Sequence, residues 1–366
     1  MFTLKGIGTV VTGTLWSGTI CEGDRLELLP ERREVRVRSL QVHNAEREEV
    51  FAGERVAANL PGISRDRISR GDTLSVPGYL KPTCMLDARV TLLDSSRSLK
   101  RGTRVRFHHG TREVMGRIYP LDGEALAPGD ERYAQLRLES KVVCVPGDRF
   151  VLRSYSPVTT IGGGIVVDAH PSRHRLNDTM AQRDIEELES GDPCRSVAVH
   201  LGRSLRPVTA EEIVFLSGLP PQTVKEDLDK MTAQGLALTL GGKKQAFLSV
   251  GRFDEVRESL VALLAEHRRA KPLSEGLARE TLRAKILTSW QLRGADSLIE
   301  RLVSDGVLET EGKVVRLPGS RAETTGEQEE LLEKILESIR GNPVSPPTIS
   351  ELALGFGCDR QLVADL

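Results

Sequence analysis

Residues 25–40, RLELLPERREVRVRSL, follow a Gly23-Asp24 pair and contain two runs in which apolar and polar residues alternate. The runs cover residues 25–29 and 35–40, and a period of two is typical of a strand with one buried face. Residues 9–12, TVVT, add another short strand candidate nearer the N-terminus. These runs predict a β-rich first part of the chain.

The Gly-Asp pair recurs at residues 71–72, 129–130 and 147–148, each time before another alternating run. Glycine adopts positive φ at no steric cost and aspartate can hydrogen-bond to its own backbone two residues on, so each pair predicts a turn. Many short strands with Gly-rich turns indicate barrels or sandwiches. We expect one β-barrel over residues 1–80 and a second over residues 81–172, because Pro82 would interrupt a strand ladder.

From about residue 177 the apolar period changes to 3.6, which is typical of helices. Residues 208–248 and 298–317 share a helical pattern, a glycine (Gly235 or Gly306) and a second pattern of short strands. Helix–turn–helix, glycine cap and two-stranded wing define a winged-helix module. We expect modules at 173–250 and 251–318 and a partial third at 326–366. Because the chain ends where the third helix of that module would lie, we expect a fragment.

The composition, with 51 Lys+Arg against 52 Asp+Glu and 39% hydrophobic residues, excludes a disordered chain. No run of 18 apolar residues predicts a membrane span, and no secretory signal is seen, so a cytoplasmic location is expected. The near-zero net charge is uneven: residues 1–171 carry 25 Lys+Arg against 21 Asp+Glu, which leaves 26 against 31 for the remainder. The first part is mildly basic and the second mildly acidic.

Motifs for catalysis and for nucleotide binding are missing. No GxxxxGK[ST] phosphate loop is present, and Val11 occupies the third glycine position of a dinucleotide fingerprint that would begin at Gly6. His108 and His109 would point to opposite faces of a strand. The five cysteines have no CxxC spacing, so the sequence predicts reduced thiols, no metal site and no enzyme.

A basic cluster lies in the expected second barrel, with Glu113 as the one acid between its ends. Its members are Arg97, Lys100, Arg101, Arg104, Arg106, Arg112 and Arg117. Arginines interleaved with apolar residues favour a cationic stripe on one sheet face, suited to phosphate contacts. A solvated strand face explains the same pattern equally well.

Residues 2–15, FTLKGIGTVVTGTL, followed by 17–20 and 22–24, resemble the opening of the second domain of translational GTPases. Further matches continue through both barrels, at 52–57, 68–74, 109–111, 146–149 and 161–164. Two such barrels followed by winged helices resemble the bacterial selenocysteine-specific elongation factors, the SelB family. Residues 263–267 and 314–317 extend the resemblance into the tail, so that it covers essentially the whole chain.

The resemblance implies a GTPase domain, with GTP and Mg²⁺, ahead of residue 1, and no cofactor in this chain. It implies selenocysteinyl-tRNA and the ribosome as partners. An mRNA hairpin that recodes UGA would be bound only through the last winged-helix modules, which this sequence lacks. A monomer without membrane contact is expected.

Site residues also follow from the resemblance. The first barrel would hold the amino acid on the tRNA, and His43 and Arg55, expected on adjacent strands, match that pocket. The second barrel would contact the acceptor and T arms, which assigns tRNA binding to Lys100, Arg101, Arg104, Arg106 and Arg112. For Arg55, a role as an ordinary surface residue stays open.

A second reading is a winged-helix DNA-binding regulator with the barrels as sensors. The expected recognition helix, residues 222–231, carries Lys225 and Lys230 against three acids. Such a helix suits a phosphate-lined groove poorly. Binding to tRNA against binding to duplex DNA separates the two readings.

Overall fold

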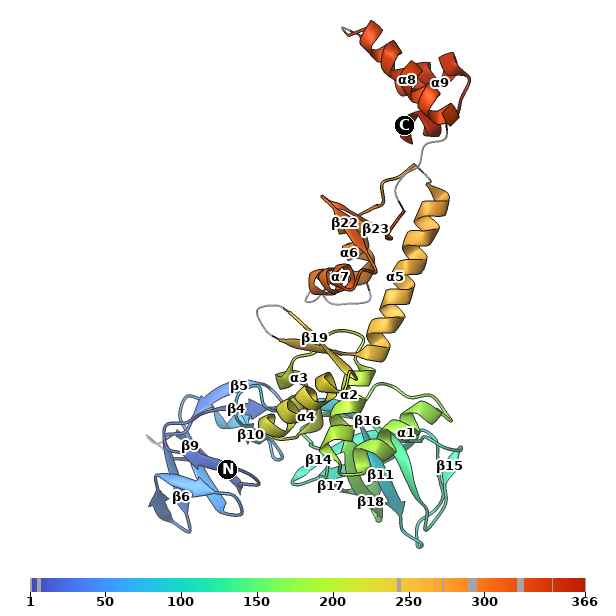
Figure 1. The fold of residues 1–366 in the computed structure, drawn as a ribbon. Helices are drawn as coiled ribbons and strands as arrows, with labels where there is room; N and C mark the ends of the chain where they lie inside the picture. Colours follow the sequence, from blue (N-terminus) through green and yellow to red (C-terminus); the bar gives the residue numbers. More distant parts are fainter. Residues whose placement is uncertain are drawn as a thin grey trace. The chain divides into compact units, whose positions relative to one another are not determined.

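The computed structural model describes residues 2–4, 8–241, 245–271, 273–288, 295–320, 326–343 and 345–365. It divides into two compact units, residues 1–200 with 211–227 and residues 201–210 with 228–366, and each is described by itself. Strands dominate the blue to green part of the chain and helices the later part (Figure 1). The predicted fold class, β-barrels followed by winged-helix modules, is confirmed.

The first β domain contains three small sheets. The five-stranded sheet has the order β1 (Phe2–Leu4), β2 (Gly8–Thr14), β9 (Arg55–Leu60), β6 (Ser39–Val42), β7 (Ala45–Arg47). The three-stranded sheet has the order β10 (Thr73–Ser75), β4 (Arg25–Leu29), β5 (Arg33–Arg36), and β3 (Thr19–Cys21) pairs with β8 (Glu49–Phe51). Buried leucines and valines from all three sheets, Leu28, Leu40, Val50 and Leu60 among them, form one core.

One strand predicted in this domain is wrong in detail. The alternating run 35–40 is two strands, β5 and β6, which belong to different sheets. The chain crosses between the sheets at Val37, which is fully buried and donates its N–H to the carbonyl of Asp24. The period of two is interrupted at the crossing, where the polar Arg38 and Ser39 both lie between the buried Val37 and Leu40.

The Gly-Asp turns have a common geometry. In each, the aspartate N–H donates to the carbonyl three residues back, and the glycine has positive φ, from 79° to 93°. These are features of a type II turn, which needs glycine at its third position. The predicted side-chain contact is wrong in direction, because the carboxylate accepts the N–H three residues earlier, at 2.6–2.9 Å. Glu54 closes a fifth turn in the same way on Phe51, 2.7 Å away.

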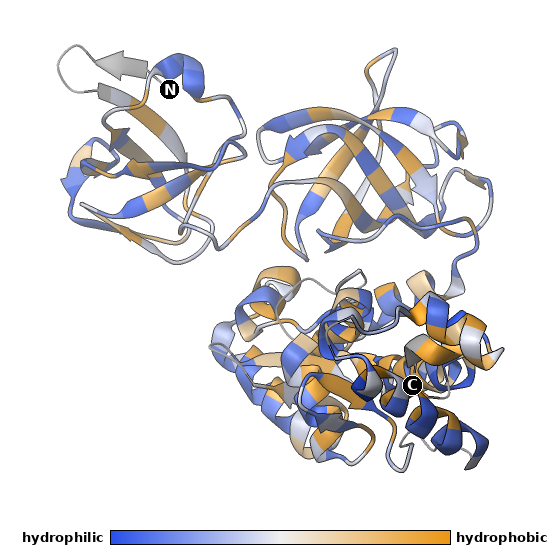
Figure 2. Ribbon diagram, turned by 90° about the horizontal axis from the view of Figure 1, so that it is seen from above, coloured by the Kyte–Doolittle hydropathy of each residue, from blue (hydrophilic) through white to orange (hydrophobic). Residues whose placement is uncertain are grey.

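The second barrel is closed. Its strand order is β11 (Thr83–Leu92), β16 (Glu131–Val142), β14 (Arg112–Pro120), β13 (Thr103–His109), β17 (Arg149–Ser154), β18 (Thr160–Asp168). A ribbon of β12 (Leu99–Lys100) and β15 (Ala125–Leu126) extends from it. Apolar and polar residues alternate along these strands (Figure 2), and the inward ones, including Leu86, Phe107 and Leu136, are fully buried.

Three glycines of β18 allow the barrel to close. A Cβ on Gly162, Gly163 or Gly164 would lie 2.4, 2.5 or 2.1 Å from a backbone oxygen of a neighbouring strand. All three glycines lie within β18. Only a residue without a side chain permits this approach of backbones.

The linker, residues 169–178, and helix α1 (Thr179–Glu189) cover the outside of β11, β16 and β18. Asp178 caps the helix, since its carboxylate accepts the N–H of Ala181 at 3.1 Å. Ile185 packs with Leu121 and Val167 in a small cluster. The linker therefore runs along the barrel before α1 begins.

The first winged-helix module follows α2 (Pro193–Arg203). It consists of α3 (Ala210–Ser217), α4 (Pro221–Ala233), β19 (Ala237–Leu240) and β20 (Ala246–Ser249). The element order agrees with the sequence pattern, whereas residues 242–244 of the wing and residues 5–7 of the supposed fingerprint lie outside the described residues. The domain limits given above stay predictions.

The second module begins with α5 (Val250–Ala270), capped by Ser249. It continues with β21 (Leu277–Ala278), α6 (Arg279–Leu287), α7 (Ala295–Ser304), β22 (Glu309–Glu311) and β23 (Val314–Arg316). The sequence analysis predicted a two-stranded wing, but β21 adds a third strand beside β23. Leu264, Leu282, Leu298 and Val315 share one core.

The last helices are α8 (Gly326–Gly341), α9 (Ile349–Phe356) and α10 (Arg360–Asp365). Thr348 and Glu351 form a reciprocal capping box at the start of α9. The core is small and includes Ile335, Leu352 and Val363. Among the described helices, none has the length and apolar character needed to cross a membrane.

Candidate nucleic-acid interface

One outer face of the second barrel gathers arginines from four neighbouring strands. On β13, Val105 and Phe107 point into the core, so Arg104 and Arg106 point outward. The arginines of the face are Arg104, Arg106, Arg117, Arg137 and Arg153, and we call them the cationic face.

Strand register brings these arginines together from distant parts of the sequence. Arg104 lies opposite Arg117 on β14, and Arg117 lies opposite Arg137 on β16. Arg106 lies opposite Arg153 on β17. Directly opposed residues have Cβ atoms about 5 Å apart, so the guanidinium groups share one surface.

Two carboxylates only partly neutralise the face. Glu139 accepts two hydrogen bonds from Arg104, at 2.7 and 2.8 Å, and Glu113 accepts one from Arg106 at 2.5 Å. These bonds lower the pKa of both glutamates, so they stay ionised. Five guanidinium groups against two carboxylates leave the surface positively charged.

Two donors at the centre of the face have no protein acceptor. Within the described part of the chain, Nε of Arg106 and Nε of Arg153 are buried and make no hydrogen bond. A buried N–H left unpaired costs about 1–3 kcal/mol. Burial lowers the pKa of the adjacent His108, and Arg153 and Arg106 lower it further against the opposing effect of Glu113. The two unpaired Nε donors favour an anionic ligand at this point.

Tyr155 gives the cationic face an exposed aromatic edge. Its ring lies 4.8 Å from the guanidinium carbon of Arg104 and 5.9 Å from that of Arg106, and the residue is 49% exposed. At the other edge, Tyr119 lies under Arg137, 4.0 Å away, and near Arg101, 5.3 Å away. Arginines beside aromatic rings can contact both phosphates and unstacked bases.

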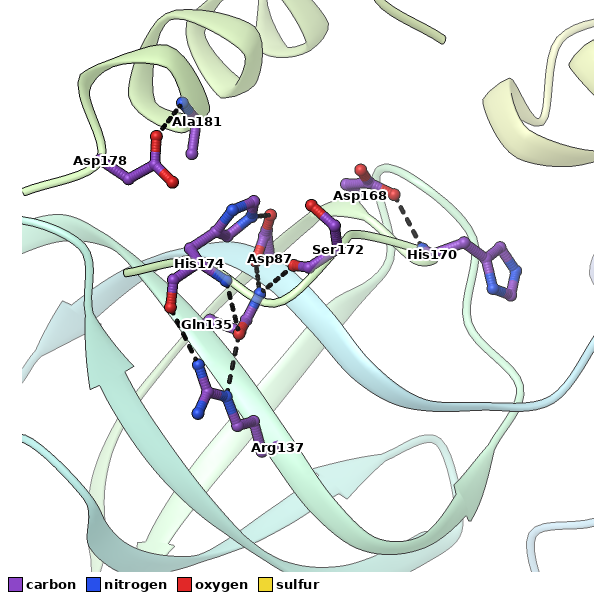
Figure 3. Close-up of polar contacts among 9 residues, drawn as sticks. All are labelled: Asp87, Gln135, Arg137, Asp168, His170, Ser172, His174, Asp178 and Ala181. Carbon is purple, nitrogen blue, oxygen red and sulfur yellow. Dashed lines mark hydrogen bonds and ion pairs between the residues drawn. The ribbon is translucent and has the colours of Figure 1, made fainter. Parts of the chain in front are cut away.

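A buried polar network holds Arg137 in place (Figure 3). Arg137 donates from Nε to Gln135 at 2.9 Å and from Nη2 to the carbonyl of His174 at 3.2 Å. Gln135 in turn donates to Asp87, at 3.0 Å, and to the carbonyl of Ser172, at 2.8 Å. Nε2 of His174 lies 2.6 Å from Asp87. The network thus joins the linker, the barrel wall and the cationic face.

Asp87 is the most buried member of this network. It is fully buried, and burial raises its pKa, while the hydrogen bond and charge of His174 act in the opposite direction. The carboxyl therefore depends on His174 and Gln135 to offset its desolvation.

His170, at the start of the linker, makes stability depend on pH. Its ring centroid lies 4.6 Å from that of Phe215, and burial, with Lys81 and His200, lowers its pKa to about 4 against the opposing effect of Asp168. The unfolded chain takes up this proton near pH 6.5, so the stability from neutral His170 is present above that pH. It is lost as the pH falls towards 4, by about 3 kcal/mol.

We expect His170→Phe, which keeps ring packing on Phe215, to flatten this acid loss. The measurement is the free energy of unfolding of unit 1 at pH 7, 6, 5 and 4 for both proteins. Equal pH slopes for wild type and variant would show that His170 does not titrate between these values.

The predicted tRNA residues do not all share the cationic face. Arg104 and Arg106 lie at its centre, whereas Arg101 lies at its edge beside Tyr119 and donates to the carbonyl of Pro120. Lys100 is exposed on the separate β12–β15 ribbon. Arg112 pairs with Asp72 of the first barrel at 3.2 Å, which favours a structural role for it.

The two predicted aminoacyl-pocket residues lie at the same end of the β6–β9 strand pair. The last register pair of β6 and β9 is Val42 with Val56, so the next positions bring His43 towards Arg55. We expected His43 on a strand, but it lies in the turn after β6, where its φ is 51°. Both residues are exposed. Their assignment stays a prediction.

Sequence reasoning missed Arg137, Arg153 and Tyr155. All three lie in runs already predicted as strands or directly beyond them. The signal that was lacking is barrel order, because β16 and β17 are neighbours of β14 and β13 in space and not in sequence.

Three models of known protein families match parts of this chain. The model "Elongation factor Tu domain 2" matches residues 8–75, and "Selenocysteine-specific elongation factor, beta-barrel domain" matches residues 86–173. "Elongation factor SelB, winged helix" matches residues 261–317. A selenocysteine-specific elongation factor of Desulfomicrobium baculatum is 31% identical over 355 residues. The chain belongs to the family of selenocysteine-specific elongation factors.

The similarity spans the chain but only part of its relatives. The match to the Desulfomicrobium baculatum factor covers 95% of this chain and 55% of that protein. A selenocysteine-specific elongation factor of Escherichia coli (strain K12) is 26% identical, over 98% of this chain and 55% of the relative. This family member therefore spans about half the length of the relatives it matches.

A solved structure supports the fold. The crystal structure of a bacterial selenocysteine-specific elongation factor, EF-Sec, matches with a TM-score of 0.67 at 19% identity. The match covers 99% of this chain and 55% of that one. At this identity the likeness concerns the arrangement of barrels and winged helices.

Proposed function

We propose that this chain supplies the tRNA-binding part of a selenocysteine-specific elongation factor, which delivers selenocysteinyl-tRNA to the ribosome at recoded UGA codons. The observation that carries the proposal is the cationic face, with its two unpaired buried Nε donors and its exposed Tyr155. Arginines on a rigid sheet can bind the phosphates of a tRNA arm in a fixed register. The relatives are named selenocysteine-specific elongation factors, which supports a role in translation elongation.

We propose that GTP and Mg²⁺ bind to the whole factor and not to residues 1–366. The present sequence has no GxxxxGK[ST] motif. We propose that residues 1–366 bind tRNA and connect domains, and that they do not hydrolyse GTP. The ribosome and an mRNA hairpin are proposed partners of the whole factor.

Charge reversal on the cationic face tests the function. We expect Arg104→Glu/Arg106→Glu to weaken binding of aminoacylated tRNA by roughly 100-fold, because each charge-assisted contact contributes about 1.5–3 kcal/mol. Filter binding at one fixed salt concentration gives the dissociation constants, with duplex DNA as a second probe.

The matched control is Arg257→Glu/Arg301→Glu on α5 and α7. These arginines are exposed to a similar extent and each pairs with a carboxylate, here an aspartate, but they lie outside the cationic face. We expect their reversal to leave tRNA affinity within about twofold. Unchanged tRNA binding by the first pair, or tighter binding of duplex DNA than of tRNA by the wild type, would contradict the proposal.

We propose that His43 and Arg55 recognise the amino acid on the tRNA. A selenol is more acidic than a thiol, so selenocysteine carries a negative charge at neutral pH, whereas serine on the same tRNA is neutral. The exposed Arg55, at the start of β9, would offer a cation to that anion, and His43, in the turn after β6, a hydrogen-bond donor.

We expect Arg55→Ala to reduce the preference for selenocysteinyl-tRNA over seryl-tRNA by about ten- to a hundredfold. The loss should fall on selenocysteinyl-tRNA alone, since serine has no charge for Arg55 to bind. Competition binding between the two tRNAs measures the ratio. If Arg55→Ala weakens both tRNAs equally, Arg55 contacts the RNA and not the selenol.

A further inference from the structure

A second cluster of polar side chains lies apart from the cationic face, where β13 ends. His109 is the last residue of that strand, and Cys144 and Asp148 lie in the loop between β16 and β17. The imidazole nitrogen, the thiol sulfur and a carboxylate oxygen all lie within 4.8 Å of one another. None of the three takes part in the proposed RNA contacts.

All three side chains are withdrawn from solvent. The side chain of His109 is 8% exposed and that of Asp148 is 16% exposed, and Cys144 is 3% exposed. Nε2 of His109 lies 3.0 Å from Oδ2 of Asp148, yet this nitrogen makes no hydrogen bond to any described residue. A buried imidazole nitrogen in that position lacks the partner that buried polar atoms normally have.

The donor atoms are held in place by their surroundings. Oδ2 of Asp148 accepts the N–H of Val145 at 2.9 Å, as part of a type II turn. The Trp16 and His109 rings are perpendicular at a centroid distance of 5.4 Å, and the Phe107 ring stacks with that of His109 at 6.4 Å. Fixed donor atoms reduce the entropy that a ligand has to overcome on binding.

The donor set selects the class of ligand. An imidazole nitrogen, a thiolate and one carboxylate suit Zn²⁺, whereas Mg²⁺ and Ca²⁺ prefer oxygen atoms alone. The negative charges of a thiolate and a carboxylate balance the charge of Zn²⁺, which makes the bound state acceptable in a buried place. We propose that His109, Cys144 and Asp148 form a Zn²⁺ site with three protein ligands and water as the fourth.

The bound ion would join the loop 143–148 to the end of β13. Binding releases the proton of the Cys144 thiol, because the thiolate is the ligand. The site would thus stabilise the barrel at the end that lies next to Trp16 of the first barrel. Local sequence patterns do not reveal such a site, since its donors come from two separate segments.

Titration of the metal-free chain with Co²⁺, followed by displacement with Zn²⁺, tests the proposal. Because the thiols of Cys21, Cys84, Cys194 and Cys358 would also bind Co²⁺, the main protein is the variant in which these four are serine. We expect it to bind one Co²⁺ with thiolate-to-cobalt absorption. Cys144→Ser in this background should abolish that absorption, and Asp148→Asn should weaken binding about 10- to 100-fold.

Two further results decide the outcome. Zn²⁺ should raise the melting temperature of the four-serine variant and leave that of the Cys144→Ser protein unchanged. If the four-serine variant is folded by circular dichroism and binds no Co²⁺, the proposal is overturned. If the Asp148→Asn protein binds Co²⁺ with the same affinity as the four-serine variant, Asp148 is not a ligand of the ion.

Discussion

Gly164→Ala is expected to destabilise the second barrel by about 4 kcal/mol or more. A Cβ at this position would lie 2.1 Å from the carbonyl oxygen of Arg89 and 2.9 Å from the Phe150 ring. Gly164 is paired with Val90 on one side and Phe150 on the other, so neither strand can move away without breaking its ladder. Because the barrel is closed, the strain has no free edge at which to relax.

Hydrogen exchange of the β11 and β18 amides measures the effect within the barrel, which matters because a chain of several domains does not unfold in one step. The control is Gly13→Ala on β2, where a Cβ meets nothing within 4 Å. Its effect should stay within about 1 kcal/mol. If the β18 amides of the Gly164→Ala protein were as protected from hydrogen exchange as those of the wild type, the close approach of the strands would be contradicted.

Asp87→Ala is expected to destabilise the barrel and its linker by about 3–5 kcal/mol. The substitution removes the carboxylate that lies 2.6 Å from Nε2 of the buried His174. It also removes one of the two acceptors of the Gln135 side-chain amide, the one at 3.0 Å. Gln135 also positions Arg137 and holds the carbonyl of Ser172. The loss should therefore release the linker and disturb one end of the cationic face.

Denaturant titration followed by exchange of the β11 and β16 amides measures this loss. Asp87→Asn keeps the shape and one acceptor, so we expect it to lose less than the alanine variant. Asp66→Ala serves as the surface control, since that side chain is 78% exposed. A change below 1 kcal/mol for Asp87→Ala would mean that solvent or other groups satisfy its partners.

The strands were predictable because burial repeats locally. A period of two marks the buried face of β13 or β17 without knowledge of its neighbours. The Gly-Asp pairs mark turns because a type II turn needs glycine at one position. The crossing at Val37 was not predictable in this way. The break in alternation at Arg38 and Ser39 is short, and a bulge within one strand would give the same pattern as a passage to the next sheet.

The candidate site was only partly predictable. The cluster from Arg97 to Arg117 pointed to β13 and β14, but closeness in sequence also brought in Lys100 and Arg112. Lys100 lies on the β12–β15 ribbon, and Arg112, at the start of β14, pairs with Asp72. Arg137 and Arg153 join the face through strand pairing over long sequence distances. Asp87 looked like any strand aspartate, because the linker that buries it comes from residues 172–174.

Photo-crosslinking from Tyr155 tests the central claim most directly. A benzophenone amino acid at this position places a reactive group at the exposed edge of the cationic face, and the same group at Leu336 on α8, 40% exposed, is the control. The account predicts a crosslink from position 155 to the acceptor or T arm of selenocysteinyl-tRNA, and none from position 336. Tight tRNA binding without a crosslink from position 155 would contradict it.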